Sequence, residues 1–269
     1  MKIKELKVNK AVKAAVIIAV LTLLFAGAAY LIVYLSGFRI IKYVSDSGET
    51  RFFGKIGKDG EPSTGTVYFA DGGKAELDLP NNTITYQDGT IYVGQTEDLL
   101  PNGKGRLTFS SGEYYDGDFV NGQMTGYGTY VYQPAVGDRY EGFMENGLRS
   151  GKGKYTWADG SYYDGTYKND MKDGEGTYIW ADGSSYTGTF VNDVKDGKGV
   201  FVYPNGDKYE GDFVADVREG EGTYTWTSGE YYVGQFRSNM MDGHGTYYWT
   251  SGRSYEGTFK ENKIVWELD

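Results

Sequence analysis

The residues best suited to chemistry are one histidine, a row of regularly spaced carboxylates and repeated Gly-x-Gly pairs. His244 is the only histidine, and the chain has no cysteine. Because no serine or cysteine stands in a recognisable arrangement with His244, we interpret it as a solvent-facing strand residue and not as a general base. The Gly-x-Gly pairs lack the strand–turn–helix context of a phosphate-binding loop. Catalysis needs one asymmetric constellation, which a repeating pattern does not offer, so the sequence predicts no enzyme activity.

The carboxylates raise the question of a calcium site. Asp173, Asp196, Glu219 and Asp242 stand just before successive Gly-x-Gly pairs. Ca²⁺ takes six to eight oxygen ligands at about 2.3–2.6 Å, but equivalent residues two strands apart in a sheet are separated by about 9.6 Å. They are too far apart to share one ion. We therefore predict a solvated acidic edge at these positions and a protein that holds no metal or other cofactor.

The same glycines belong to a repeat of 23 residues. The tyrosine of a Tyr-x-Gly motif first occurs at Tyr92 and returns every 23 residues up to Tyr255, with one step of 25. A Gly-x-Gly pair begins eleven residues after each tyrosine up to Tyr232, and an aromatic residue follows seventeen residues after it. Such a period predicts a repeat architecture. The positions that define it include Tyr115, Gly117, Gly126, Gly128, Tyr140, Gly142, Trp157, Tyr163, Gly165, Gly174, Gly176, Trp180, Tyr186, Gly188, Tyr209, Gly211, Trp226, Tyr232, Gly234 and Trp249.

Each repeat must supply two strands joined by tight turns. In the unit at 161–183, Tyr163 and Gly165 share one face of the first strand, and Gly176 and Trp180 share one face of the second. We interpret the two glycines as leaving room on which aromatic rings lie flat. Stacked hairpins would bury the tyrosine and tryptophan rows as a common core. The predicted fold is all-β, an elongated single-layer antiparallel sheet of stacked β-hairpins, with about nine units over residues 52–269.

These motifs at this period resemble the MORN repeat (membrane occupation and recognition nexus). Residues 209–229, YEGDFVADVREGEGTYTWTSG, are close to a consensus unit, and the resemblance covers about four-fifths of the chain. The family often has histidine just before Gly-x-Gly, whereas this chain has Asn, Thr, Ser, Asp or Glu there. The resemblance implies a non-enzymatic role in protein–protein interaction and often self-association, so a homodimer is one expected assembly.

A second kind of segment precedes the repeats. Residues 14–38 contain no charge, and a helix of this length spans the roughly 30 Å hydrocarbon core of a bilayer. The small residues at 26–28 would also suit a signal-peptide cleavage site, but the apolar run continues beyond the usual 7–15 residues. We favour an uncleaved anchor. The predicted organisation is a basic cytoplasmic tail at 1–13, a transmembrane helix at 14–38, a juxtamembrane segment with one degenerate strand at 39–51, and the repeat domain at 52–269.

Charge limits the partners. Five lysines precede the apolar segment, which places the amino terminus in the cytoplasm and the repeats outside the cell. Residues 40–269 hold 21 Lys or Arg against 36 Asp or Glu, a balance that excludes nucleic acid and disfavours lipid binding by the repeats. The lysine-rich start and the absence of cysteine favour a bacterial cell membrane.

Two functions fit this pattern. The first is a membrane-anchored scaffold that binds a membrane-associated protein partner, and the alternative is a binding module for an envelope glycan. The polar strand positions between the tyrosines form the candidate interaction face: Tyr162, Asp164, Thr166, Ser185, Thr187, Thr189, Lys208, Glu210 and Asp212.

Overall fold

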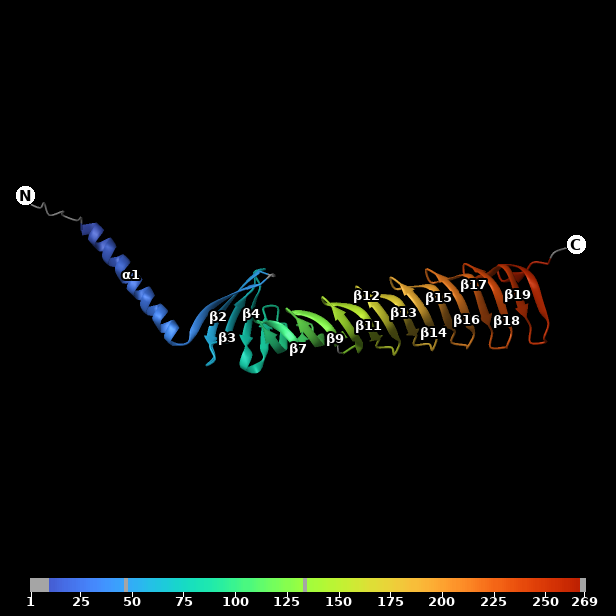
Figure 1. Ribbon diagram of the computed structural model, residues 1–269, viewed down its shortest axis with the longest axis horizontal. Helices are drawn as coiled ribbons and strands as arrows, with labels where there is room; N and C mark the ends of the chain where they lie inside the picture. Colours follow the sequence, from blue (N-terminus) through green and yellow to red (C-terminus); the bar gives the residue numbers. More distant parts are fainter. Residues whose placement is uncertain (1–9, 46–47, 133–134, 267–269) are drawn as a thin grey trace, which may run out of the picture. The chain divides into compact units, whose positions relative to one another are not determined.

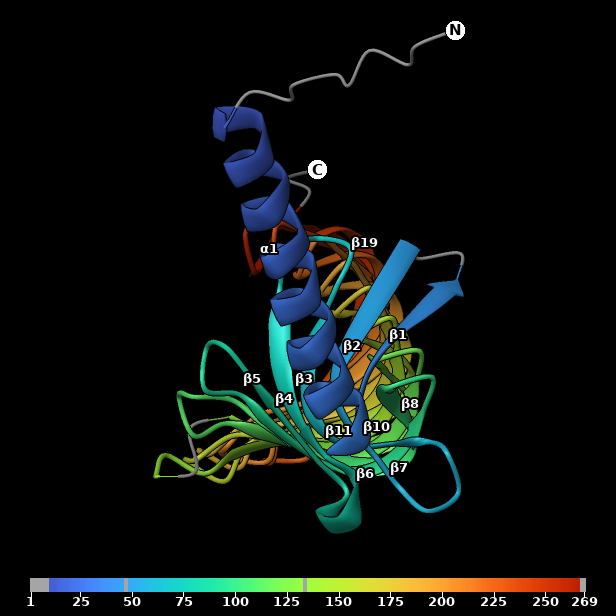
Figure 2. The same ribbon diagram turned by 90° about the vertical axis from the view of Figure 1, so that its left-hand side faces the viewer.

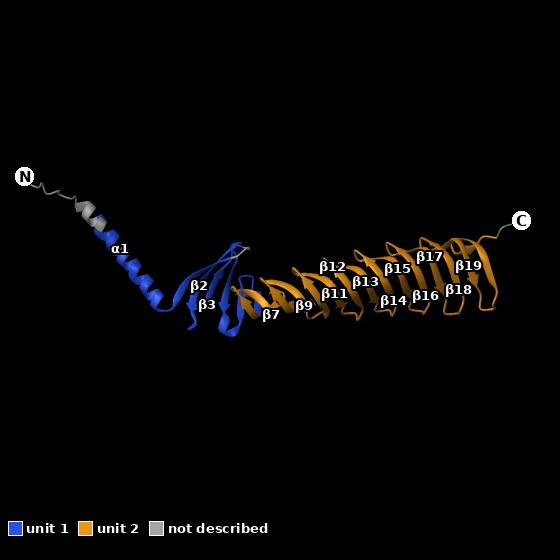
Figure 3. Ribbon diagram, in the orientation of Figure 1, with its two compact units in different colours: residues 1–93 blue, residues 94–269 orange. Residues whose placement is uncertain are grey.

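The computed structural model describes residues 10–45, 48–132 and 135–266 of the 269-residue chain (Figure 1). Within these ranges the chain forms one α-helix, a short 3-10 helix and 21 strands. The strands belong to one open antiparallel sheet. The predicted all-β fold of antiparallel hairpins behind an apolar helix is therefore confirmed. The chain divides into two compact units, residues 1–93 and 94–269, which Figure 3 colours separately.

In the first unit the helix is followed by short strands. Its elements are α1 (Lys10–Leu35), β1 (Phe38–Ser45), β2 (Gly48–Ile56), β3 (Pro62–Tyr68), β4 (Lys74–Asp78), η1 (Leu79–Asn81), β5 (Thr83–Tyr86) and the start of β6 (Ile91–Glu97). Each of the strands β1 to β5 pairs antiparallel with the strand that follows it. The residues 17–35 of α1 form a helix long and apolar enough to cross a membrane, and none of that window is buried. A signal sequence near the amino terminus would also meet these criteria of length and apolarity.

The helix ends at a glycine in a left-handed backbone conformation. Gly37 has a φ of +85°, and its N–H donates a hydrogen bond to the Tyr34 carbonyl at 3.2 Å, which is typical of glycines that terminate helices. β1 begins at the next residue (Figure 2). The helix thus starts four residues and ends three residues before the predicted 14–38 span. The predicted segment at 39–51 contributes to two paired strands, β1 and β2, and not to a single degenerate strand.

The second unit is a run of hairpins. Its strands are β7 (Leu100–Thr108), β8 (Tyr114–Val120), β9 (Gln123–Tyr132), β10 (Asp138–Glu145), β11 (Leu148–Thr156), β12 (Tyr162–Lys168), β13 (Met171–Ile179), β14 (Ser185–Val191), β15 (Val194–Val202), β16 (Lys208–Val214), β17 (Val217–Thr225), β18 (Tyr231–Arg237), β19 (Met240–Tyr248), β20 (Ser254–Lys260) and β21 (Lys263–Ile264). One 23-residue repeat supplies one strand pair, as the sequence predicts.

Two kinds of turn join these strands. At the turn between β14 and β15, both Asn192 and Asp193 have positive φ, 48° and 74°, as a two-residue type I′ hairpin turn requires. At the turn between β13 and β14, Gly183 has a φ of +86° and its N–H donates to the Trp180 carbonyl at 3.0 Å. The two-residue turns match the twist of the flanking strands, and the hairpins they close have the same register from β12 to β19.

The core consists of tyrosine rings lying on glycines. Tyr163 is fully buried, and a Cβ atom added to Gly176 would lie 2.4 Å from its hydroxyl oxygen and 2.5 Å from its Cε2. A Cβ atom on Gly165 would meet the same ring. The Tyr163 hydroxyl donates to the Thr166 carbonyl at 3.0 Å. The prediction that these two glycines make room for a flat ring is confirmed, and the hydroxyl is satisfied by the backbone.

Edge-to-face ring contacts connect the core from hairpin to hairpin. Tyr163 contacts Phe190 at 5.1 Å between ring centroids, Phe190 contacts Tyr186, and Tyr186 contacts Phe213, with interplanar angles of 84–89°. The chain of contacts continues to Phe259 and Tyr255. We call the face that carries these rings the aromatic face. Each hairpin therefore completes the core of its neighbour, which explains why a single hairpin would not be stable.

The tryptophan row is not part of this buried core, and that prediction was wrong. The row consists of Trp157, Trp180, Trp226 and Trp249, and all four are half-buried. The physical reason is their place at the end of a strand, where the chain leaves the sheet for a turn: β13 ends at Ile179, one residue before Trp180. Rings at that margin have neighbours on fewer sides than the tyrosines at the centre of the strands.

Candidate functional site

The predicted interaction face is assembled as one surface, which we call the polar face. It comprises the strand positions that point away from the buried tyrosines. Asp164 pairs with Thr177, which pairs with Thr187 on the next strand, and the line continues through Val200 to Glu210. All nine predicted residues are exposed or half-buried. The structure thus places the predicted residues of β12, β14 and β16 on one side of the sheet.

An open depression of about 590 Å³ lies on this face. Thr187, Thr189 and Glu210 contribute to its walls, and backbone of Gly188 and Gly211 forms part of its floor. The floor is bare because the side of these glycines that would carry a Cβ faces the tyrosine rings on the opposite side of the sheet. The wall residues have polar side chains that can exchange hydrogen bonds with a partner.

This face also carries aromatic side chains, and the sequence reasoning missed one exposed pair of them. Tyr127 and Phe143 lie opposite each other on β9 and β10, with ring centroids 5.5 Å apart and planes at 82°. They are 47% and 49% exposed. A comparison of the repeats would have identified this pair. Other units have Lys, Glu or His between the two glycines where Tyr127 stands, and Asp, Thr or Gln at the position of Phe143.

On the aromatic face, the half-buried row stacks upon itself. Tyr178 and Trp180 have ring centroids 4.4 Å apart and planes at 28°, and Trp157 and Phe201 lie on either side of them at 5.0 and 5.4 Å. Each of these rings thus lies beside another ring, so the row adds contacts between neighbouring hairpins.

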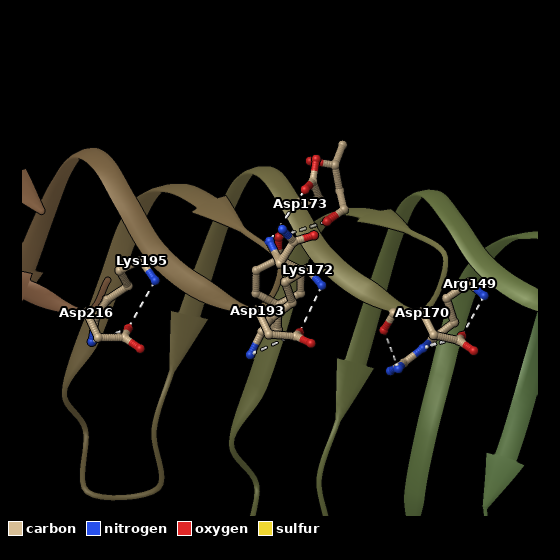
Figure 4. Close-up of polar contacts among 10 residues, drawn as sticks. Arg149, Asp170, Lys172, Asp173, Asp193, Lys195 and Asp216 are labelled. Atoms are coloured by element: carbon tan, nitrogen blue, oxygen red, sulfur yellow. Dashed lines mark hydrogen bonds and ion pairs between the residues drawn. The ribbon is translucent and has the colours of Figure 1, made fainter. Parts of the chain in front are cut away.

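A row of cations crosses the aromatic face at 23-residue intervals. Arg149, Lys172, Lys195 and Arg218 each lie within 6 Å of several ring centroids. The first three also face a carboxylate from the following turn, as Figure 4 shows. Burial lowers the pKa of Lys172, and the charge of Asp193 opposes that shift. These cations are already matched by rings and carboxylates, so they hold neighbouring hairpins together.

The same turns exchange backbone hydrogen bonds with the preceding hairpin. Asp193 donates its N–H to the Lys172 carbonyl at 2.9 Å, and its side-chain oxygen accepts from the Lys172 N–H, also at 2.9 Å. In later units the oxygens of Asn239 and Asn262 accept the equivalent bond at 2.8 Å. The bond therefore needs an oxygen and not a charge.

Exchanging Asp193 tests that conclusion. We expect Asp193→Asn to change the free energy of unfolding by less than about 0.5 kcal/mol, since the ammonium and carboxylate are 3.8 Å apart and Asp193 is itself exposed to solvent. Asp193→Ala should lower it by about 1–2 kcal/mol, because it removes the acceptor and places alanine at positive φ. Urea denaturation of the detergent-solubilised protein, followed by tryptophan fluorescence, measures both. An equal loss in the two variants would show that the charge matters more than the hydrogen bond.

The predicted solvated acidic edge is only partly observed. Glu219 accepts a hydrogen bond from the Ser238 N–H of the next turn at 2.9 Å. Asp242 is buried between Arg237 and Lys260, with contacts of 3.5 and 2.9 Å, and the Lys260 contact lowers its pKa. These carboxylates thus fix the turns that follow them. His244 is exposed, as predicted, and its backbone N–H donates to Gln235.

Burial of the core tyrosines makes the fold sensitive to alkali. It raises the pKa of Tyr186 and of Tyr232 to about 12, because the charged phenolate loses its hydration. Each group therefore contributes stability that is fully present below the unfolded pKa near 10 and is lost as the pH rises towards 12. We expect the melting temperature to fall between pH 10 and pH 12. Absorbance of phenolate at successive pH values should rise together with unfolding, and titration of all tyrosines near pH 10 in a folded protein would contradict this.

Comparison with known protein families identifies repeats in the chain. The sequence model of the MORN repeat matches residues 100–114, 115–134, 140–162, 163–185, 186–208, 209–231 and 232–252. No curated protein matches the chain significantly. These seven segments span more than half of the chain.

Several solved structures match this chain, but with low TM-scores. The TCP domain of SAS-4 from Drosophila melanogaster, in complex with a proline-rich motif of Ana2, is 13% identical over 77% of this chain and 96% of its own, with a TM-score of 0.32. A streptogramin B lyase is 13% identical over 84% of both chains, with a TM-score of 0.16. Virginiamycin B lyase from Staphylococcus aureus is 14% identical over 82% of this chain and 70% of its own, with a TM-score of 0.15. TM-scores this low carry no argument about this chain. From the seven matched repeats and the tyrosine-on-glycine hairpins, we conclude that the chain belongs to the MORN repeat family.

Proposed function

We propose that this protein is a membrane-anchored, non-catalytic scaffold whose polar face binds a protein partner. MORN repeats are typical of scaffolds for protein or membrane interaction. The observation that carries the proposal is the exposed pair of Tyr127 and Phe143 on the polar face. Large aromatic side chains surrounded by polar groups are the usual anchors of protein–protein interfaces.

The two faces differ in what they expose to a partner. On the aromatic face, rings stack on rings and the cations are matched by rings and carboxylates. On the polar face, the exposed aromatic pair and the hydroxyl and carboxylate groups around the depression remain accessible to a partner. A partner that covers the polar face removes exposed apolar surface without breaking the core, so binding there is compatible with a stable fold.

Photo-crosslinking in intact cells tests the polar face. A photoreactive phenylalanine analogue placed at Phe143 should give a discrete adduct with one protein, identified by mass spectrometry. The same analogue at Val214 is the matched control, because Val214 lies on the polar face and is 53% exposed but is distant in sequence from the aromatic pair. An adduct with a second copy of this chain identifies a homodimer.

A double variant provides a second test of the polar face. Exchange of Tyr127 and Phe143 for threonine should abolish capture while the melting temperature stays unchanged. Stronger adducts from Val214 than from Phe143, or capture that survives the double exchange, would show that the aromatic pair is not the anchor. A single His244→Ala exchange that abolishes function in a folded protein would point to an active site and end the non-catalytic proposal.

The topology of the anchor is tested separately. The lysines before residue 14 support a cytoplasmic amino terminus and extracellular repeats. Proteinase added to intact cells should then remove the chain beyond about residue 45 and leave a membrane-bound stub. Protection of the repeats until the cells are lysed would reverse the orientation. A mature amino terminus at Ala29 would show that the apolar segment is a cleaved signal.

A further inference from the structure

The hairpin that follows α1 carries an exposed apolar patch. Ile40 and Val44 on β1, Phe53 on β2 and Tyr68 on β3 are 71%, 82%, 42% and 47% exposed. They occupy alternating strand positions on the side opposite the buried Phe52. Ile40, Phe53 and Tyr68 also line a hollow of about 640 Å³. We call these four residues the juxtamembrane patch.

This patch departs from the repeat. Phe53 follows Phe52 as Asp164 follows Tyr163 and Glu210 follows Tyr209, so an apolar ring stands where those units have a carboxylate. The structure therefore has an exposed aromatic ring at a position where the other units have Val, Thr, Asp or Glu. Large exposed apolar side chains that gather on one surface mark an interaction site.

The chain itself limits what can cover the patch. α1 ends at Leu35, and an extended chain spans at most about 3.6 Å per residue, so Ile40 lies within roughly 18 Å of the helix end. The Ile56 N–H donates to the Gly37 carbonyl at 3.2 Å. The Arg39 guanidinium donates to the Tyr34 carbonyl at 2.8 Å and lies 3.6 Å from the Tyr34 ring centroid. These bonds hold the hairpin at the end of the helix. If α1 crosses a bilayer, the patch begins in its headgroup region.

Local charge matches the same environment. Residues 38–56 carry four Lys or Arg and two Asp or Glu, in contrast to the acidic excess of residues 40–269 as a whole. Lys42 and Arg51 share the carboxylate of Glu49, and the Lys55 ammonium lies 5.8 Å from the Phe38 ring centroid. Basic side chains beside apolar ones are typical of segments that lie in the interface of an anionic bilayer.

We propose that the juxtamembrane patch inserts into the headgroup region of an anionic lipid bilayer, and this rests on the membrane anchoring proposed above. Apolar side chains of β1 to β3 enter the boundary between headgroups and acyl chains, while Lys42, Arg51 and Lys55 lie beside lipid phosphates. The hairpin thereby fixes the first unit against the membrane surface. Because the end of α1 holds the juxtamembrane patch at the bilayer, a protein partner could bind the patch only by displacing lipid from it.

The absence of cysteine allows a direct test on the full chain. Val44→Cys, labelled with an environment-sensitive fluorophore, is reconstituted into vesicles of phosphatidylcholine and phosphatidylglycerol that contain nitroxide-labelled lipid. Val214→Cys is the matched control, because its side chain is also exposed, at 53%. We expect severalfold stronger nitroxide quenching at residue 44 than at residue 214. Lys42→Glu combined with Lys55→Glu should weaken the quenching in these vesicles but not in vesicles of phosphatidylcholine alone.

The outcomes separate this proposal from the anchor. Equal quenching at residues 44 and 214, in protein that floats with the vesicles, would overturn the patch proposal and leave the anchor intact. Protein that does not float with the vesicles would overturn both. A label at residue 44 that is shielded from water but not quenched by lipid, with disulfide formation between two copies of the unlabelled Val44→Cys variant, would show that a second chain covers the patch and would also overturn the proposal.

Discussion

Replacing Tyr186 with alanine is expected to lower the free energy of unfolding by about 3–5 kcal/mol, the range for truncating a buried aromatic side chain. Tyr186 is fully buried and contacts Phe190 and Phe213 edge to face at 5.1 Å. Its loss exposes a cavity to both neighbouring hairpins. Urea denaturation of the solubilised protein, combined with hydrogen exchange of β12 to β17, would show the loss and its local extent.

Two variants serve as controls for this result. Tyr186→Phe keeps the ring and removes only the hydroxyl that donates to the Thr189 carbonyl at 3.0 Å, so we expect a loss of about 0.5–1.5 kcal/mol. Trp180→Ala removes a larger but half-buried ring and should cost less than Tyr186→Ala. If Trp180→Ala proved the more damaging, the core would lie along the tryptophan row.

Gly199→Ala is the second exchange with a large expected effect. A Cβ atom at residue 199 would lie 2.4–2.5 Å from Cε2, Oη and Cζ of Tyr186, and the ring cannot withdraw because Phe190 and Phe213 enclose it. We expect a loss of about 1–3 kcal/mol from overpacking. In the Tyr186→Ala background the same exchange should be nearly harmless, which gives a coupling energy between residues 186 and 199 of about 1–3 kcal/mol.

Gly188 provides the matched control for this cycle. A Cβ atom there would lie 2.5 Å from the Lys198 carbonyl oxygen, 2.6 Å from the Gly199 Cα and 2.6 Å from the Tyr186 hydroxyl oxygen. Removal of the Tyr186 ring relieves only the last of these contacts and should therefore rescue Gly188→Ala less than Gly199→Ala. Equal rescue of both glycine variants would contradict the view that the ring alone requires glycine at residue 199.

The repeat period alone predicts most of the fold. A 23-residue step with alternating polarity requires two strands for each unit, and glycine beside tyrosine on one face implies a ring lying on the backbone. Both follow from local geometry that every unit shares. The burial of Trp180 could not be predicted in the same way, because periodicity shows that a position recurs but not how near it lies to the margin of the sheet.

The candidate site was predictable only in its outline. Alternation assigns Asp164, Thr187 and Glu210 to one face, and the structure confirms that assignment. The pair of Tyr127 and Phe143 depends on the pairing register of β9 and β10, since the two residues are sixteen positions apart and meet only across strands. The end of α1 depended on the conformation of Gly37, which a hydropathy pattern does not report.

The reciprocal bonds between a two-residue turn and the hairpin before it recur at five successive turns, from Asp170 to Asn262, and make this part of the array modular. Each of these hairpins carries one half of the joint at its start and the other half at its turn, as Lys172 and Asp193 show. Duplication or deletion of 23 residues therefore leaves no joint without its complement, and each added unit lengthens the sheet by two strand spacings, about 9.6 Å. Evolution can therefore change the length of the sheet by whole repeats without altering the contacts between neighbouring hairpins.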